Sequence, residues 1–262
     1  MIHSILADKA TRLYIILGAF FVANALVAEM IGVKLFQLES ALGLSKADFS
    51  LLGQDHLSFV LSVGVLPWPI VFIMTDVVND YYGVRGVRFL TLITAALIAF
   101  AFVVMYFAIH IAPAGFWITS SEAQGVPDMQ AAFTNIFGQG MNIILGSLAA
   151  FIIGQLVDAF VFRRIKRITG DKRIWLRATG STLISQLIDS VVVTYVAFFV
   201  FKGWSFALCT ALVLTAYCYK LVVALLSTPL VYVAHMGVER YLGKERAHAM
   251  REAALAMNAD VP

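Results

Sequence analysis

Long apolar runs are the feature of this sequence that most constrains its fold. They lie at about 13–33, 57–75, 88–112, 133–162, 181–201 and 206–236. Each run approaches or exceeds the roughly 20 residues that a helix needs to cross a hydrocarbon core of about 30 Å. Hydrophobic residues make up 61% of the chain and charged residues only 13%, which excludes a water-soluble surface of ordinary composition. The runs therefore predict an all-α, polytopic membrane protein with six transmembrane helices.

The distribution of basic residues predicts the orientation. The segment 163–177 contains seven Lys or Arg residues and a single acidic residue, Asp171. The connection at 113–132 has two acidic residues and no Lys or Arg. Because basic side chains resist translocation, we expect 163–177 and both termini to be cytoplasmic in an inner-membrane protein. We divide the chain into a transmembrane domain, 1–238, and a charged cytoplasmic tail, 239–262, which is predicted to be helical up to Met257.

Polar residues inside the apolar runs are the candidate functional residues. A charge at the centre of a helix in lipid costs about 2.5–3.5 kcal/mol, so each needs a partner or a wet cavity. Asp189 and Lys220 lie midway along the last two runs, and we expect them to form an interhelical ion pair. The other candidates for a substrate site are Asn24, Glu29, Trp68, Asp76, Asn79, Gln155, Asp158, Gln186 and Tyr219. The alternative is that such groups only link helices, at about 0.6 kcal/mol for each hydrogen bond.

Two local patterns add to this interpretation. Pro67-Trp68-Pro69 is expected to interrupt the second run and to line a cavity, because a proline inside a helix frees backbone carbonyls. The segment 75–83 (TDVVNDYYG) is expected at the cytoplasmic end of that run, where its carboxylates could build a gate or a latch paired with cations.

A weak internal repeat links the fourth and fifth runs. Residues 154–159 (GQLVDA) and 185–190 (SQLIDS) share the pattern small, Gln, Leu, aliphatic, Asp, small. Because neighbouring helices run antiparallel, a structural repeat here would need a two-fold axis in the membrane plane. A chance match is the alternative.

Four stretches, 20–36, 74–88, 151–193 and 219–232, resemble the family of queuosine-precursor transporters. The resemblance implies an inner-membrane importer of 7-cyano-7-deazaguanine and 7-aminomethyl-7-deazaguanine for queuosine synthesis in tRNA. It also implies a fold similar to the substrate-binding components of energy-coupling-factor vitamin transporters. The alternative function is such a component, acting only with an ATPase. An enzyme is not expected, since the sequence has neither a Ser/His/Asp set nor a His-Glu-x-x-His zinc motif.

A deazaguanine ligand would need three kinds of contact. A carboxylate accepts the paired N1–H and amino donors, a donor meets the carbonyl, and an aromatic ring stacks on the base. The assignments left open are Asp189 or Glu29 for the donors, Gln186, Asn24 or Lys220 for the carbonyl, and Trp68 or Tyr219 for stacking. The partners expected are this small molecule and the lipid bilayer, without nucleic acid, metal or cofactor. Small-residue helix faces permit a homodimer.

Overall fold

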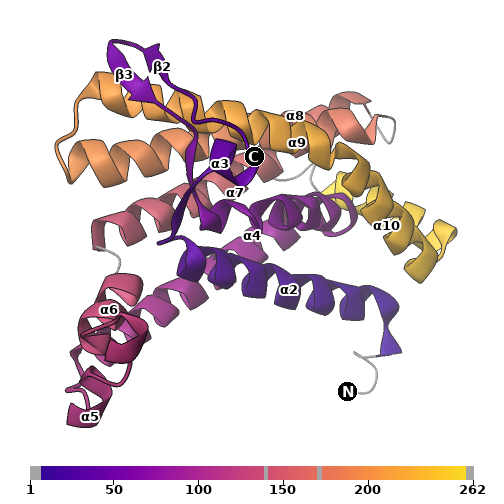
Figure 1. Ribbon diagram of the computed structural model, residues 1–262. Coiled ribbons are helices and arrows are strands. Elements are labelled where there is room, and N and C mark those ends of the chain that lie inside the picture. The colour runs from indigo at the N-terminus through magenta and orange to yellow at the C-terminus, as the bar shows by residue number, and fades with distance from the viewer. Residues whose placement is uncertain (1–6, 139–140, 170–172, 258–262) are drawn as a thin grey trace.

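The computed structural model describes residues 7–138, 141–169 and 173–257 and shows a bundle of long helices (Figure 1). Its helices are α2 (Lys9–Ile31), α3 (Leu38–Ala41), α4 (Trp68–His110), α5 (Gly115–Ile118), α6 (Met129–Phe137), α7 (Met141–Thr169), α8 (Ile174–Thr194), α9 (Phe206–Leu242) and α10 (Lys244–Met257), with the shorter η1 (Val63–Val65), η2 (Glu122–Gln124) and π-helical η3 (Tyr195–Val200). Four described segments are long and apolar enough to cross a membrane, namely Lys9–Ile31, Val63–His110, Ile174–Val200 and Phe206–Leu242. The predicted class, an all-α membrane protein, is confirmed at this level.

The beginning of the second predicted run is not helical. Two antiparallel sheets of two strands each precede α4, β1 (Leu35–Gln37) with β4 (Val60–Ser62) and β2 (Phe49–Leu51) with β3 (Gln54–Leu57), and the second run begins within them. Helix α4 starts only at Trp68, with Pro67 as its N-cap and a proline in the first turn. A proline fits there because the first amides of a helix have no intrahelical acceptor. The expected interruption of a helix by Pro67-Trp68-Pro69 is therefore wrong, since this motif begins one.

Helix α4 is a hairpin of two antiparallel arms. Val71, Met74, Ala95 and Ile98 pack in one core cluster, although residues 71 and 98 would lie about 40 Å apart in a straight helix. The reversal occurs at Gly83, whose φ of 73° and ψ of 179° are not helical. The arms pack against each other and against α2 and α7 through a core that also includes Phe21 and Phe151. Helix α4 therefore includes parts of both the second and the third predicted run.

The fourth predicted run, 133–162, is divided. Helix α6 ends at Phe137 and α7 begins at Met141, while residues 139–140 lie outside the described part of the chain. Gly138 caps α6 by donating its backbone N–H to the carbonyl of Thr134, 2.7 Å away. Helix α7 then continues to Thr169, beyond the predicted end of the run. The sequence predicts one helix here, because apolar composition alone does not show where a helix is broken.

The last two runs and the tail form α8 with η3, α9 and α10. Helix α9 extends through Pro229 to Leu242, past the predicted domain boundary at residue 238. Helix α10 packs back on α4 and α9, and Ala247 and Ala254 are fully buried. The tail is therefore a docked helix up to Met257, and residues 258–262 lie outside the described part of the chain.

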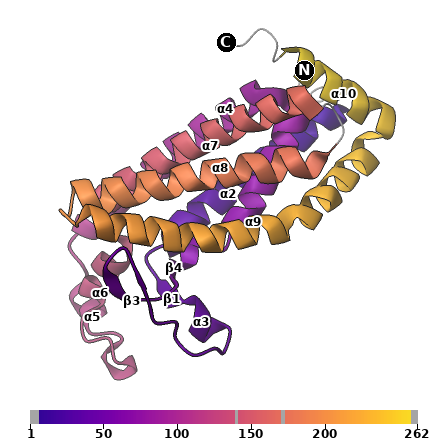
Figure 2. The same cartoon turned by 90° about the horizontal axis from the view of Figure 1, so that it is seen from above.

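The two ends of the bundle differ. The start of α2 contacts the junction of α9 and α10, because Lys9 donates a hydrogen bond to the carbonyl of Tyr241. The β sheets, α5 and α6 lie together at the opposite end of the bundle (Figure 2). The first described residues and α10 thus share one end, as the orientation argument requires.

Replacing Gly83 by alanine is expected to destabilise the α4 hairpin by about 1–3 kcal/mol, since this backbone conformation is essentially restricted to glycine. The measurement is thermal unfolding in detergent. Gly115→Ala is the matched control, because a Cβ at that position meets no atom within 4 Å. Equal melting temperatures for the two variants would contradict the assigned turn.

Docking of α10 is expected to weaken in acid. The hydroxyl and backbone amide of Thr11, followed by Arg246 of α10, hold the pKa of Asp8 well below its usual range. A carboxylate with a lowered pKa stabilises the fold above its unfolded pKa of about 4, and this contribution is lost as the pH falls through the folded pKa. Hydrogen exchange of α10 should therefore accelerate in acid in the native chain. In Asp8→Asn the exchange, corrected for its intrinsic pH dependence, should be insensitive to pH.

Candidate substrate site

Asp189 of α8 and Lys220 of α9 form the predicted ion pair. The Nζ atom of Lys220 lies 2.6 Å from Oδ2 of Asp189. The two side chains are only partly enclosed, with 26% of Asp189 and 17% of Lys220 exposed. The expected contact is confirmed, and neither side chain is fully enclosed by protein.

Glu29 of α2 and Ser147 of α7 extend this site. The hydroxyl of Ser147 donates a hydrogen bond of 2.6 Å to Oε1 of Glu29, and the charges of Glu29 and Asp189 act on each other. We refer to Glu29, Ser147, Asp189 and Lys220 as the Asp189 cluster. It joins α2, α7, α8 and α9, and it presents two carboxylates, one ammonium group and one hydroxyl.

The predicted aromatic residues lie in different surroundings. The indole of Trp68 packs against Phe72 and Phe151, with ring centroids 5.8 Å away in both cases. Phe151 is one helical turn beyond Ser147 on α7, so the two side chains project from the same face of that helix. Trp68 thus packs against a residue that follows Ser147 by one turn of α7. Tyr219 is half-buried on α9, one residue before Lys220.

Asn24 satisfies its amide within its own helix. Its Nδ2 atom donates a hydrogen bond of 2.8 Å to the carbonyl of Phe20. The structure therefore gives Asn24 a local hydrogen bond on α2, and its contact with substrate stays a prediction.

A second group of polar residues is fully buried between α4, α7 and α8. Thr75 donates to Oε1 of Gln155 over 2.9 Å, and Nδ2 of Asn79 donates to the carbonyl of Ala159 over 3.1 Å. The members of this buried polar layer are Thr75, Asp76, Asn79, Gln155, Asp158, Ser181, Ser185 and Gln186. Five of the predicted site residues thus lie here, and their side chains are enclosed by protein.

The α7–α8 interface gives structural meaning to the internal repeat. Ser185 donates a hydrogen bond of 3.1 Å to Oδ1 of Asp158. A Cβ placed on Gly154 would lie 3.5 Å from the Cβ of Asp189. Gly154 and Ser185 hold the same place in the two copies, as do Asp158 and Asp189. In each contact the small residue of one copy therefore meets the aspartate of the other, which is the relation that a local two-fold axis produces.

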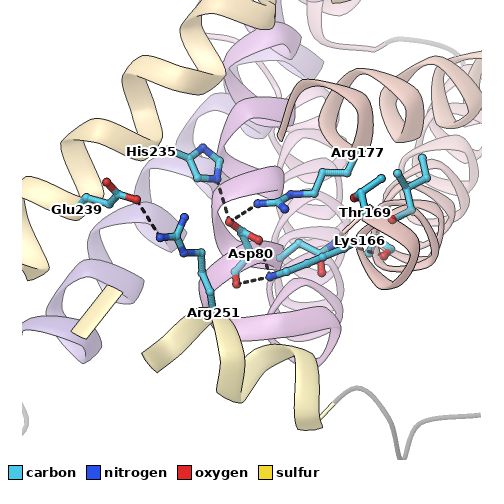
Figure 3. A network of polar contacts seen from close by, with 10 residues as sticks. Asp80, Lys166, Thr169, Arg177, His235, Glu239 and Arg251 are labelled. Atoms are coloured by element: carbon cyan, nitrogen blue, oxygen red, sulfur yellow. Dashed lines mark hydrogen bonds and ion pairs between the residues drawn. The ribbon is translucent and has the colours of Figure 1, made fainter. Parts of the chain in front are cut away.

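Asp80 forms the most heavily charged contact of the described structure (Figure 3). Its Oδ1 lies 2.5 Å from Nζ of Lys166, and its Oδ2 lies 2.8 Å from Arg177 and 3.1 Å from Nε2 of His235. None of these side chains is more than 4% exposed. One carboxylate thus connects α4, α7, α8 and α9, and we call these four residues the Asp80 centre.

Helix α10 covers the Asp80 centre. Arg251 of α10 lies 3.0 Å from Glu239 of α9 (Figure 3). It also lies 5.7 Å from the ring centroid of Tyr81, whose ring packs at a tilt against His235 with centroids 5.7 Å apart. In segment 75–83, Asp80 is thus paired with cations, as the latch hypothesis expects, and a gating role for the segment stays a prediction.

Sequence reasoning missed Lys166, Arg177 and His235. The basic composition of 163–177 predicts charges at the membrane surface that set the orientation. Instead, Lys166 lies within α7 and Arg177 within α8, and Arg177 is fully buried. A usable signal was the spacing of Asp76 and Asp80, four residues apart and hence on one helix face. A second carboxylate on that face requires cations, and the basic segment 163–177 was the nearest source.

No group of three or more His, Cys, Asp or Glu side chains within the described ranges is arranged to hold a metal ion. The polar chemistry available is therefore that of carboxylates, amides, hydroxyls and cationic side chains.

Comparison with known proteins decides the family. Residues 62–234 match the family model described as "Putative vitamin uptake transporter". The chain belongs to this transporter family. It is 34% identical over 180 residues to a protein of Bacillus subtilis named probable queuosine precursor transporter, covering 66% of this chain and 71% of that protein. It is 25% identical over 206 residues to the queuosine precursor transporter of Escherichia coli, covering 74% of this chain and 82% of that protein.

These matches confirm the resemblance noted from the sequence. A protein of Haemophilus influenzae with the name probable queuosine precursor transporter is 24% identical over 148 residues, 55% of each chain. No solved structure matches the chain significantly. Family membership and the apolar helices together make this a multi-pass membrane transporter. The names of the relatives give no support to the alternative of an energy-coupling-factor subunit.

Replacing Asp80 by asparagine is expected to destabilise the protein by about 3–5 kcal/mol, because it removes one partner of a buried ion pair. Thermal unfolding in detergent measures the change. Asp48→Asn, which breaks an exposed pair with His56, is the matched control and should have little effect. Equal effects of the two substitutions would show that the Asp80 centre does not hold the helices together.

Proposed function

We propose that this protein imports queuosine precursors, 7-cyano-7-deazaguanine and 7-aminomethyl-7-deazaguanine, across the inner membrane. The observation that carries the proposal is the similarity to relatives named queuosine precursor transporters over most of their length. The Asp189 cluster supports it independently, because it offers the chemistry that a planar deazaguanine requires.

The substrate is proposed to bind at the Asp189 cluster. A carboxylate, Asp189 or Glu29, would accept the N1–H and the amino group of the base in a bidentate contact. Lys220, which is paired with Asp189, would donate a hydrogen bond to the carbonyl of the base. The indole of Trp68 would provide the stacking surface.

Several of the other predicted residues already form hydrogen bonds within the protein. Asn79 and Gln155 each have a buried partner, which favours a structural role for them in this conformation. Gln186, Asn24 and Tyr219 stay predictions for substrate contact, as does a homodimer.

Six crossings of the membrane are part of the proposal. The two arms of α4 supply two crossings, and α2, α7, α8 with η3, and α9 supply one each. An even number puts the two termini on one side, in agreement with their common end of the bundle. The basic ends of α7 and α8 favour the cytoplasm for that side.

Uptake tests the proposed site. Asp189→Asn and Lys220→Met are expected to abolish precursor uptake in a strain that depends on imported precursor for tRNA queuosine, since each removes a group that contacts the base. The measurement is the queuosine content of tRNA, with the amount of transporter in the membrane determined in parallel. Glu122→Gln, an exposed carboxylate in η2, is the control.

The double variant Asp189→Asn with Lys220→Met separates binding from folding. It removes both charges together, so neither is left without its partner, and a purely structural pair would regain full uptake. Loss of uptake at normal membrane abundance would support the binding role. Restored uptake would contradict it.

A further inference from the structure

Asp76 and Asp158 have the most unusual carboxylates in the buried polar layer. Asp76 is 2% exposed and Asp158 is fully buried. Oδ1 of Asp76 and Oδ2 of Asp158 are enclosed and have no hydrogen-bond partner among the described residues. A buried acceptor without a donor is costly, more so when it carries a charge.

The surrounding charges do not neutralise this pair. Asp76 and Asp158 both lie at the α4–α7 contact, because hydrogen bonds join Thr75 to Gln155 and Asn79 to Ala159 on either side of them in the two helices. The charged groups near Asp76 are Asp158 of α7, Asp80 of α4 and Arg177 of α8. Arg177 and Lys166 are both in direct contact with Asp80, as is His235 of α9. The neighbours of Asp158 are hydroxyl groups of α8, on Ser181, Thr182 and Ser185.

The charges of this group of buried side chains do not balance. Three carboxylates, Asp76, Asp80 and Asp158, face two permanent cations, Lys166 and Arg177, so the described group carries one negative charge in excess when His235 is neutral. One proton would balance the group and would supply the donor that the two enclosed oxygens lack. A proton needs one donor and one acceptor oxygen, whereas a hard metal cation takes about six oxygen ligands.

We propose that the Asp76–Asp158 pair is the binding site of a proton that is transported together with the substrate. This inference rests on the proposed function and specifies how uptake is driven. The proton is held by one carboxyl oxygen and shared with the other, and it leaves to water on the cytoplasmic side when the pair becomes exposed there.

The α7–α8 interface connects this site to the substrate. Ser185, which donates to Asp158, and Asp189, which contacts Lys220, lie four residues apart on the same face of α8. A rearrangement of Asp189 on substrate binding therefore acts through one rigid helical turn on the hydrogen bond to Asp158. Helix α8 carries both contacts, and a shared rigid helix of this kind can couple two sites.

The experiment uses the purified full chain in liposomes with radiolabelled 7-cyano-7-deazaguanine. Potassium and valinomycin hold the membrane potential at zero, and a gradient of about one pH unit, acidic outside, is imposed. One proton per substrate then permits up to about tenfold accumulation. A pH-sensitive dye inside the liposomes should report proton entry when substrate is added to the native protein. A protonophore should abolish the accumulation.

Asp158→Asn and Asp76→Asn are the test variants, because asparagine is a neutral isostere of the protonated acid. Each should lose the roughly tenfold accumulation, and any substrate exchange that it retains should no longer respond to pH. Asp55→Asn, on the exposed hairpin, should behave like the native protein.

The outcomes separate the two proposals. If the native protein neither accumulates nor exchanges the deazaguanine, the proposed function fails and this inference fails with it. If it exchanges substrate but accumulates none with the pH gradient, or accumulates it with a sodium gradient instead, only the proton site is overturned. Full pH-driven accumulation by both asparagine variants would also overturn it. Even if a variant does not fold, the absence of a dye signal with the native protein would overturn the proposal.

Discussion

A single carboxylate, that of Asp80, connects four helices through three buried basic side chains. Inside a bilayer the lipid is as apolar as leucine, so apolar burial does not specify how helices pair. The contacts of Asp80 with Lys166, Arg177 and His235 do, because each charged group would be costly anywhere else in the interior. The arrangement of α4, α7, α8 and α9 follows from satisfying these groups together. Helix α10 then covers the assembled centre through Arg251.

The remaining polar groups are distributed between two environments. The ion pair of the Asp189 cluster is partly exposed. The buried polar layer, by contrast, is enclosed and largely satisfied by neighbouring side chains and carbonyls. Such a division suits a transporter, which needs accessible groups to replace the water around a solute and fixed groups to keep its helices in register.

The sequence predicted the class of fold and one contact well, and the element boundaries less well. Apolar length is a strong signal for a membrane helix, and an isolated Asp and Lys in two such runs have few choices except each other. Proline and glycine were harder to place. Pro67 and Pro69 begin a helix instead of breaking one, and Gly83 reverses a chain that composition alone would leave straight. The buried ion pairs of the basic residues at 163–177 were not predicted, because charge near a membrane surface fits a loop and a buried ion pair equally well.

The antiparallel contact of α7 and α8 has a directional consequence. At present Asp158 lies opposite Ser185, and Asp189 lies opposite Gly154. A slide of one helical turn in one sense would set Asp158 against Asp189, two carboxylates whose charges repel. The same slide in the other sense would set Gly154 against Ser185, two small residues that permit close approach. A shift of the interface by one helical turn would therefore bring together either two carboxylates or two small residues, depending on its direction.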